Sequence, residues 1–246
     1  MEVQVLVDQH RNGVHLGERD CSVQRRHQKI IEETPSPAMN DEARNRLREL
    51  AIRSVLAAGY ESAGTLEFLL DGEGNFYFIE INCRIQVEHP ITEMVTGIDL
   101  IAEQIRLASG EKLALRQDEI QLRGHAIEFR INAEDPGDNF APQTGTVEEL
   151  QLPGGPGVRV DTHLYAGYEV PPYYDSLLAK LVVWGETREI ALARSRRALA
   201  EFQVGGIKTN LPFHRGIIDN AAFLEGAVST NLLDRVGPAA FVAGGA

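Results

Sequence analysis

A β-hairpin in residues 65–82 is the feature that most constrains the fold of this chain. Two runs rich in aromatic and branched aliphatic residues, 65–70 and 76–82, flank the turn sequence Asp71-Gly-Glu-Gly-Asn75. Apolar runs separated by a short segment of glycine, asparagine and aspartate favour two antiparallel strands. Together with helices and short strands elsewhere, the hairpin predicts an α+β fold with antiparallel sheets.

Further segments carry the signals of strands and helices. Residues 2–7 read as a strand that an Asn-Gly turn returns through residues 14–16. A helix is predicted for residues 40–58, with Asn40 as its cap and Gly59 at its end. Further helices are predicted at 98–109, 188–202 (capped by Thr187) and 212–220, and further strands at 124–132, 145–152, 158–164 and 177–184.

The character of the sequence changes near residues 115–121, where helices give way to short strands and Gly/Pro turns. We therefore predict one domain over residues 1–120 and a second over 121–236. Residues 237–246 are rich in alanine and glycine and are predicted to form a flexible tail.

Composition excludes several classes of function. The net charge of −12 argues against binding to nucleic acid or to anionic membranes, which requires a basic face. The sequence contains no run of 18 apolar residues, so no membrane span is predicted. Two cysteines, Cys21 and Cys83, are too few for a disulfide framework, so a reducing, cytoplasmic location is expected.

The hairpin is predicted to bring two carboxylates together. Because strand side chains alternate, Phe76, Phe78, Glu80 and Asn82 should share one face. If the turn takes four residues, Glu67 stands opposite Glu80. Like charges facing each other repel, and Mg²⁺ or Mn²⁺ would compensate them. The alternative is that both side chains are simply solvated.

The segment after the hairpin, Asn82-Cys-Arg-Ile-Gln-Val-Glu-His-Pro90, is dense in polar residues. Arg84 offers a planar fork of donors suited to a small oxyanion such as bicarbonate or phosphate. Glu88 is a candidate general base. The alternative is an exposed loop in which arginine and glutamate form a weak surface ion pair.

Four motifs, in order along the chain, resemble those of biotin carboxylases. They cover most of the sequence, and their agreement in order makes the resemblance specific. They are Glu18-Arg-Asp-Cys-Ser-Val-Gln-Arg-Arg-His-Gln-Lys29, Phe78-Ile-Glu-Ile-Asn-Cys-Arg-Ile-Gln-Val-Glu-His-Pro-Ile-Thr-Glu-Met94, Gly124-His-Ala-Ile-Glu-Phe-Arg-Ile-Asn-Ala-Glu-Asp-Pro136, and Tyr165-Ala-Gly followed by Pro172-Tyr-Tyr-Asp-Ser176 and Lys180.

The resemblance implies roles for individual residues. Glu67, Glu80 and Asn82 match metal-binding positions, and Gln24 and His27 match positions near the nucleotide. Four residues match the bicarbonate-binding set: Lys29, Arg84, Gln86 and Val87. Of the catalytic set, Lys29 and Arg84 anchor the anion, Glu88 matches the base that deprotonates bicarbonate, and Arg130 matches the residue that stabilises the biotin enolate.

The resemblance also implies the fold and the reaction. Residues 1–120 resemble the antiparallel C-terminal lobe of an ATP-grasp domain, and the remainder resembles the small mixed-sheet C-terminal domain of biotin carboxylase. The implied reaction is ATP- and Mg²⁺-dependent carboxylation of biotin with bicarbonate, within acetyl-CoA carboxylase in fatty-acid synthesis. The implied partners are a biotin carboxyl carrier protein, a carboxyltransferase and a second copy of the chain.

No glycine-rich phosphate loop of this family is present, so the N-terminal and phosphate-loop lobes are expected to be missing. We therefore predict that the chain alone does not turn over ATP, because phosphoryl transfer depends on positioning. Three alternatives remain open. They are a non-catalytic dimerisation or assembly module, the biotin carboxylase of another acyl-CoA or pyruvate carboxylase, and an ATP-grasp ligase such as carbamoyl-phosphate synthetase. The motifs around Arg130 and Tyr173-Tyr-Asp-Ser176 speak against the last of these.

Overall fold

The computed structural model describes residues 1–242 and divides into two compact units. The first unit contains Met1–Cys21 and Glu33–Ala126, and the second contains Ser22–Glu32 and Ile127–Ala246. Strands β2 (Gly13–Arg25) and β3 (Gln28–Thr34) contribute residues to both. The division into domains at residues 120 and 121 stays a prediction.

The first unit is built on antiparallel strands in the order β2-β1-β4-β5. These are β1 (Glu2–Val7), β4 (Ser62–Leu70) and β5 (Phe76–Asn82), together with the first part of β2. The strand predicted for residues 2–7 and its return through Asn12-Gly13 are confirmed. The hairpin predicted for residues 65–82 is confirmed as β4 and β5.

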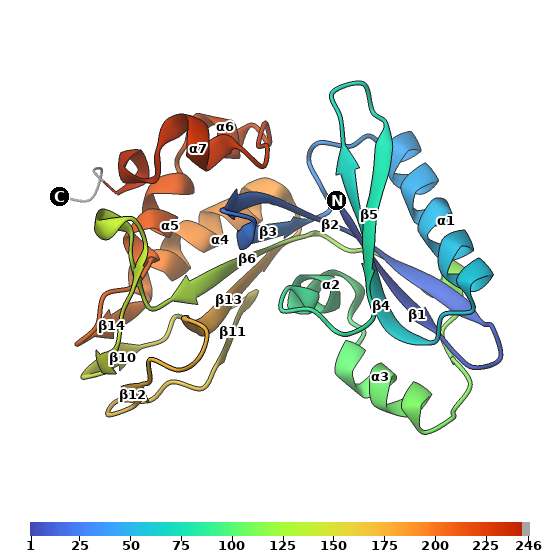
Figure 1. The fold of residues 1–246 in the computed structure, drawn as a ribbon, viewed down its shortest axis with the longest axis horizontal. Helices are drawn as coiled ribbons and strands as arrows, with labels where there is room; N and C mark the ends of the chain where they lie inside the picture. The colour runs from blue at the N-terminus through green and yellow to red at the C-terminus, as the bar shows by residue number, and fades with distance from the viewer. Residues whose placement is uncertain (243–246) are drawn as a thin grey trace. The chain divides into compact units, whose positions relative to one another are not determined.

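Helix α1 (Asp41–Ala58) covers one face of these strands (Figure 1). The Asn40 side chain accepts a hydrogen bond from the Ala43 N–H at 2.9 Å, which caps one of the unpaired N–H groups of the first turn. Gly59 ends the helix in the left-handed conformation, with φ of 68°. Both helix ends were predicted correctly because they depend on local sequence.

The two faces of β1 pack against different helices. The valines of β1 pack with the buried side chains of α1, whereas Leu6 packs with Leu100 of α3 (Leu100–Ala108). A strand covered on both faces is apolar on both faces. The polar residues Glu2 and Gln4, which lie in this buried strand, therefore need partners inside the unit.

The second unit is built on strands in the order β11-β13-β6-β3, with the last part of β2 beside β3. The new strands are β6 (His125–Asn132), β11 (Val158–Thr162) and β13 (Leu177–Gly185). Short two-stranded pairs surround them: β7 (Glu134–Asp135) with β8 (Ala141–Pro142), β9 (Gly145–Thr146) with β12 (Glu169–Val170), and β10 (Glu149–Gln151) with β14 (Gln203–Gly205). The predicted α+β class with antiparallel sheets is confirmed.

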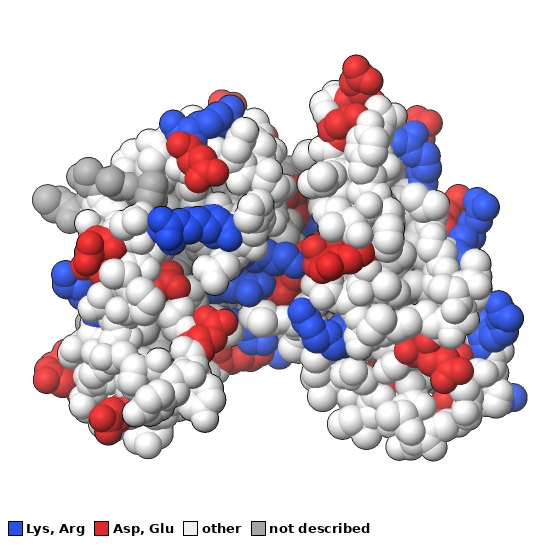
Figure 2. All heavy atoms as spheres, in the orientation of Figure 1, with Lys and Arg blue, Asp and Glu red and all other residues white. Residues whose placement is uncertain are grey.

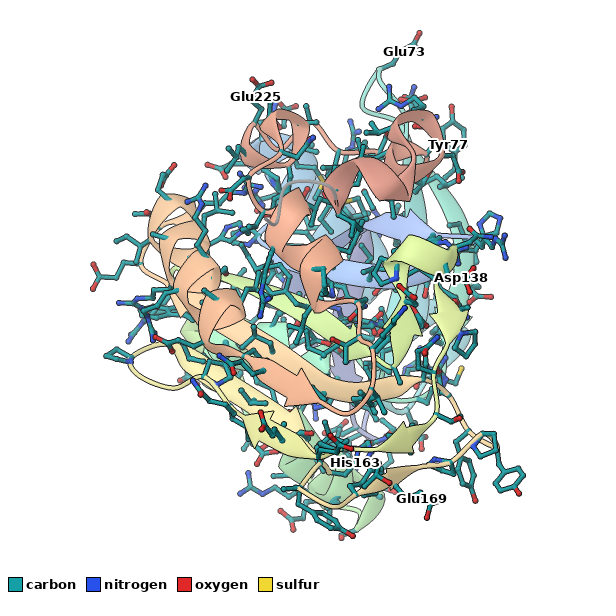
Figure 3. The ribbon with its side chains drawn as sticks, turned by 90° about the vertical axis from the view of Figure 1, so that its left-hand side faces the viewer. Glu73, Tyr77, Asp138, His163, Glu169 and Glu225 are labelled. Carbon is teal, nitrogen blue, oxygen red and sulfur yellow. The ribbon has the colours of Figure 1, made fainter. Side chains whose placement is uncertain are left out.

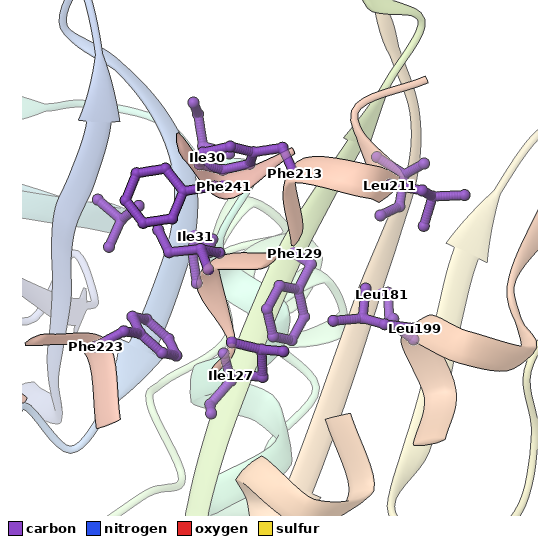
Figure 4. Close-up of a cluster of buried hydrophobic side chains, with 14 of the residues drawn as sticks. Ile30, Ile31, Ile127, Phe129, Leu181, Leu199, Leu211, Phe213, Phe223 and Phe241 are labelled. Carbon is purple, nitrogen blue, oxygen red and sulfur yellow. The ribbon is translucent and has the colours of Figure 1, made fainter. Parts of the chain in front are cut away.

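Helices cover the core of the second unit. They are α4 (Arg188–Glu201), α5 (Leu211–Ile217), α6 (Ala221–Leu224) and α7 (Leu232–Val236). The Thr187 side chain caps α4, as predicted. Figure 4 shows the aromatic side chains Phe129, Phe213 and Phe241 among branched aliphatic residues from β3 and β6.

The structure describes part of the tail predicted to be flexible from residue 237, and its flexibility stays a prediction. Pro238–Phe241 form a 3₁₀ turn (η3). The Phe241 ring is buried, and its centroid lies 5.5 Å from that of Phe213. Burial of this aromatic side chain stabilises the turn, although the segment is rich in alanine and glycine. Residues 243–246 lie outside the described part of the chain.

The remaining elements are α2 (His89–Thr96) and the 3₁₀ turns η1 (Gln117–Glu119) and η2 (Pro136–Asp138). Figure 2 shows acidic and basic side chains interspersed over the visible face. Among the described residues, no helix combines the length and hydropathy that crossing a lipid bilayer requires.

Candidate functional site

Glu67 and Glu80 lie opposite each other on the β4–β5 hairpin, as predicted, but a different geometry brings them together. The loop Asp71–Asn75 is one residue longer than the assumed turn. On its own, that extra residue would pair Glu67 with Ile79. A register shift beside Glu67 leaves Ile79 as the extra residue of a β-bulge and restores the pair.

The bulge corrects the predicted face of the strand. Phe76 packs against the core of the first unit, and the Phe78 ring meets the buried Phe68 ring edge-on at 5.8 Å between centroids. Glu80 and Asn82 lie on the other face, where they contact Glu67 rather than the core. The prediction that all four β5 residues share one face is therefore wrong for the two phenylalanines.

Amide groups compensate the two carboxylates in this structure. The Asn82 side chain donates from Nδ2 to Glu67 Oε1 at 2.9 Å and to Glu80 Oε1 at 3.2 Å. Gln86 donates from Nε2 to the same Glu67 oxygen at 2.9 Å. Three N–H groups thus face a pair of like charges.

The donor set fits a hard divalent cation. Mg²⁺ binds through one or two carboxylates completed by water and phosphate oxygens, and the hairpin offers two carboxylates on one face. Asn82 presents its nitrogen to both carboxylates, so it would serve as a ligand only with its oxygen turned toward the ion.

The hairpin tip is held by its own turn residues. Hydrogen bonds from Asn75 and the turn backbone lower the pKa of Asp71 to about 2. Tyr77, which Figure 3 labels below Glu73 at the tip, also donates to Asp71 at 3.1 Å. These bonds fix the turn and the register of the strand residues next to it, up to the bulge that pairs Glu67 with Glu80.

The polar segment after the hairpin is half buried and half exposed. Gln86 and Glu88 are 4% and 2% exposed, whereas Arg84 is exposed and donates only to the Ile85 carbonyl among its described hydrogen bonds. Glu88 immediately precedes α2, and Pro90 occupies the first turn of that helix. A solvated surface loop therefore does not describe Glu88, although it fits Arg84.

Glu88 shares its surroundings with two other buried side chains. Potential ligand atoms of Glu2, Cys21 and Glu88 lie within 4.8 Å of one another. Arg19 contributes a positive charge to the same interior, at 3.5 Å from Glu2 Oε2. The base predicted at Glu88 therefore sits in a buried, charged interior.

The predicted nucleotide contacts lie in the second unit, around the turn between β2 and β3. Arg26 and His27 both have positive φ, at 49° and 64°, as a two-residue type I′ turn requires. Asparagine and glycine usually occupy such turns, so the conformation is strained for these side chains. Gln24 and Lys29 flank the turn and are half-buried, whereas His27 is exposed.

Arg130, also in the second unit, is held by a buried carboxylate. Its guanidinium lies 2.6 Å from Oε1 of Glu32, which is completely buried. The Arg130 carbonyl accepts hydrogen bonds from Asn210 Nδ2 and His214 Nε2, both at 2.8 Å. Burial lowers the pKa of His214 to about 4, so its imidazole is neutral at pH 7.

A cavity of about 730 Å³ in the second unit is lined by none of the predicted site residues. Its wall includes Arg25, which donates to the carbonyl and side-chain oxygens of Asn139 and lies over the Phe140 ring. Gln28 and Tyr174 also line it. The cavity contains both charge signs and an aromatic wall.

The predicted residues thus fall into two sets. Hydrogen bonds join Glu67, Glu80, Asn82 and Gln86 within the first unit, which also holds the exposed Arg84, the half-buried Val87 and the buried Glu88. The second unit holds the others: Gln24, His27, Lys29 and Arg130. The roles assigned to all of them stay predictions.

Sequence reasoning missed Arg19, whose side chain is completely buried and contacts Gln86. One signal pointed to such a group. Glu2 and Gln4 alternate with valines in a strand that is apolar on both sides, and buried polar side chains of this kind need a polar partner.

Two known protein families match this chain, each over a different part of it. Residues 1–116 match the family described as carbamoyl-phosphate synthase L chain, ATP binding domain. Residues 128–235 match the family described as biotin carboxylase C-terminal domain. The second match speaks against carbamoyl-phosphate synthetase, as the motifs around Arg130 predicted.

Curated relatives carry related names. A biotin carboxylase of Nostoc is 53% identical over 96% of this chain, which covers 53% of that protein. A component of the pyruvate carboxylase of Methanothermobacter thermautotrophicus is 53% identical over 95% of this chain, which covers 48% of it. The chain therefore spans about half the length of the curated relatives it matches.

Solved structures agree with the fold. The biotin carboxylase domain of 2-oxoglutarate carboxylase from Hydrogenobacter thermophilus, a dimer in complex with MgADP, ADP and bicarbonate, superposes with a TM-score of 0.95. It is 48% identical, and the match covers 98% of this chain and 53% of that one. By sequence and by fold, this chain is similar to biotin carboxylases over about half of their length, and residues 128–235 match the biotin carboxylase C-terminal domain.

Proposed function

We propose that this chain supplies the metal- and bicarbonate-binding part of a biotin carboxylase, which carboxylates carrier-bound biotin with ATP, Mg²⁺ and bicarbonate. One observation carries the proposal. Gln86, from the predicted bicarbonate loop, donates to Glu67, a predicted metal ligand, at 2.9 Å. Two functions that the reaction must couple are thus adjacent in one hydrogen-bonded set.

Glu67 and Glu80 would hold Mg²⁺ or Mn²⁺, with Asn82 beside them. The bound cation offsets the phosphate charge of ATP during phosphoryl transfer. Gln24 and His27, on the strained β2–β3 turn, are proposed to contact the nucleotide. The proposed nucleotide site is supported by the MgADP that is bound to the 2-oxoglutarate carboxylase domain.

Bicarbonate is a poor nucleophile until it loses its proton. Lys29 and Arg84 are proposed to bind the anion with their positive charges, assisted by the Gln86 amide and the Val87 backbone. Glu88, buried at the start of α2, would accept the proton. The deprotonated anion would then attack the γ-phosphate of ATP, which gives carboxyphosphate and ADP.

Arg130 is proposed to stabilise the negative charge that develops on the ureido oxygen when biotin is deprotonated. A fixed cation does this without reorganising during the reaction. The contact with buried Glu32 holds the guanidinium in place.

The parent enzyme is proposed to be acetyl-CoA carboxylase, with a biotin carboxyl carrier protein and a carboxyltransferase as partners. Relatives named for pyruvate and 2-oxoglutarate carboxylases make these the alternative parents. We also propose a homodimer, since the 2-oxoglutarate carboxylase domain is described as one. The cytoplasmic location stays a prediction.

The proposal can be tested by completing the chain. The region of Nostoc biotin carboxylase that precedes the matched half would be joined to Met1, and ADP release measured with bicarbonate and free biotin. We expect bicarbonate- and biotin-dependent turnover from the joined protein and none from the 246-residue chain alone. A joined protein that folds, binds ATP and shows no bicarbonate-dependent turnover would contradict the proposal.

The matched control is Glu88→Gln in the joined protein. It removes the proton acceptor and keeps the size of the side chain. Turnover should fall at least about a hundredfold, as for the loss of a general base. An unchanged rate would remove Glu88 from the mechanism while leaving the family assignment intact.

A further inference from the structure

Arg19 is a cation that the proposed reaction does not use directly. It lies in β2, and its side chain is completely buried. Nη2 is 3.5 Å from Glu2 Oε2, which supplies a compensating negative charge. A guanidinium stays protonated, so its burial is costly unless neighbouring groups accept its hydrogen bonds.

Four side-chain oxygens accept hydrogen bonds from its two terminal nitrogens, whereas Nε has no hydrogen-bond partner among the described residues. Nη1 donates to Gln4 Oε1 at 2.8 Å and to Thr92 Oγ1 at 3.1 Å. Nη2 donates to Thr65 Oγ1 at 3.1 Å and to Gln86 Oε1 at 2.7 Å. The bond to Gln86 is the shortest of the four, and it is the one that leads out of the interior.

This bond decides which way the Gln86 amide points. Arginine only donates, so the oxygen of Gln86 must face Arg19 and the nitrogen must face Glu67. The reversed amide would place N–H groups against the guanidinium and an oxygen against the carboxylate. Opposite charges on its two sides therefore fix one orientation.

We propose that Arg19 is a positioning residue which, through Gln86, sets the geometry of the Glu67 carboxylate and so the affinity of the hairpin for a divalent cation. The contacts run from Arg19 to Gln86, then to Glu67, and through Asn82 to Glu80. This inference rests on the proposed function, because it assumes that the hairpin binds the metal.

Side chains that hold a metal ligand in place typically change metal affinity by about 10–100-fold when removed. A role confined to stability would instead lower the unfolding temperature and leave the affinity unchanged. The two roles differ in a second respect. Only positioning requires Gln86 as an intermediary, so only positioning makes the effects of the two residues non-additive.

The test is a double-mutant cycle on the full chain with Mn²⁺ alone as the probe. Free Mn²⁺ is measured by electron paramagnetic resonance for the unsubstituted chain, Arg19→Lys, Gln86→Met and the double variant. Lysine keeps the charge but cannot reproduce the fork of donors. We expect each single variant to weaken Mn²⁺ binding about tenfold. The double variant should bind Mn²⁺ at most about twofold more weakly than either single variant.

A spectroscopic readout accompanies the cycle. The side-chain amide protons of Gln86 should exchange slowly with solvent in the unsubstituted chain, because both ends of the amide are hydrogen-bonded. They should exchange much faster in Arg19→Lys. A purely structural role for Arg19 would not single out this amide.

Arg48→Lys is the matched control. Arg48 pairs with Glu18, a completely buried carboxylate in the same unit, but neither residue bonds to Gln86 among the described contacts. The control should lose stability without losing Mn²⁺ affinity. If Arg19→Lys does not fold, Gln86→Met alone decides, since an unchanged affinity there overturns the inference.

The outcomes separate this inference from the proposed function. Mn²⁺ binding that survives Arg19→Lys unchanged, or losses that multiply to about a hundredfold in the double variant, overturn the role of Arg19 only. Mn²⁺ binding that is absent, or that Glu80→Gln does not weaken, overturns the metal site and this inference together.

Discussion

The two units hold their candidate site residues in different ways. In the first unit, the hairpin carboxylates belong to a chain of side-chain hydrogen bonds that begins at the buried Arg19 and ends at the exposed Glu80. In the second unit, the Arg130 guanidinium is held by the buried carboxylate of Glu32, and its carbonyl is held by core residues. The first arrangement links several polar side chains in series, whereas the second fixes one side chain against the interior.

The main chain of the second unit reinforces this difference. His214 and Asn210 both donate to the Arg130 carbonyl, and the His214 ring packs edge-on against Phe129 and Phe213 of the core. Arg130 is therefore positioned by a rigid interior. The hairpin is an edge of its sheet and depends on polar contacts for its geometry.

Arg130→Met should give the largest effect on stability, because it leaves the buried Glu32 without its guanidinium. We expect a loss of about 3–5 kcal/mol in the unfolding of the second unit. Urea titration followed by the fluorescence of Trp184, the single tryptophan, reports on this unit. A loss below about 1 kcal/mol would mean that Arg130 is not held by the ion pair.

His214 should make the second unit sensitive to acid. Its pKa in the folded protein is about 4, below its ordinary value of 6.5, so the unfolded chain takes up the proton first as the pH falls. The stabilisation is complete above pH 6.5 and is lost as the pH falls toward 4. The loss at pH 5, relative to neutral pH, should amount to about 2 kcal/mol.

The pH test compares two proteins. The difference in unfolding free energy between pH 7 and pH 5, measured through Trp184, should be smaller in His214→Asn than in the unsubstituted chain. Equal differences in both proteins would show that His214 titrates normally in the folded state.

Glu80→Gln should have a smaller effect, and of the opposite sign. It removes one of two facing like charges, so the first unit should gain about 0.5 kcal/mol in thermal stability while its Mn²⁺ affinity falls. Circular dichroism melting of this variant beside Glu73→Gln, at the exposed hairpin tip, isolates the effect of the pair. Destabilisation by Glu80→Gln would mean that the carboxylates do not repel each other.

Arg84→Met should affect stability least, within about 0.5 kcal/mol, because Arg84 is exposed and donates only to the Ile85 carbonyl among its described bonds. In the joined protein it should raise the KM for bicarbonate. Unchanged kinetics would place anion binding elsewhere.

Much of the fold was predictable because its signals are local. Asn40 and Thr187 cap helices at the residues that the sequence indicates, and the hairpin is where its turn residues place it. The bulge at Ile79 was not predictable, because it depends on how both strands pack against the core. The pairing of Glu67 with Glu80 was predicted correctly, but from a turn that is one residue too short.

The residues of the candidate site stay a prediction, and their arrangement could not be predicted from the sequence. Arg19 and Gln86 are 67 residues apart, and no local pattern connects them. Helix α2 was overlooked although its signals were present, with Pro90 in its first turn and Gly97 in the left-handed conformation at its end. The polar segment Asn82–Pro90 was predicted as a loop, but its last two residues, His89 and Pro90, form the start of α2.

A Mn²⁺ titration followed by nuclear magnetic resonance tests the central claim most directly. Paramagnetic broadening should appear first at the signals of Glu67, Glu80 and Asn82, next at Gln86, and should vanish in Glu67→Gln. Broadening centred instead on Glu2, Cys21 and Glu88, or spread over the acidic surface, would contradict the assignment of the hairpin as the metal site.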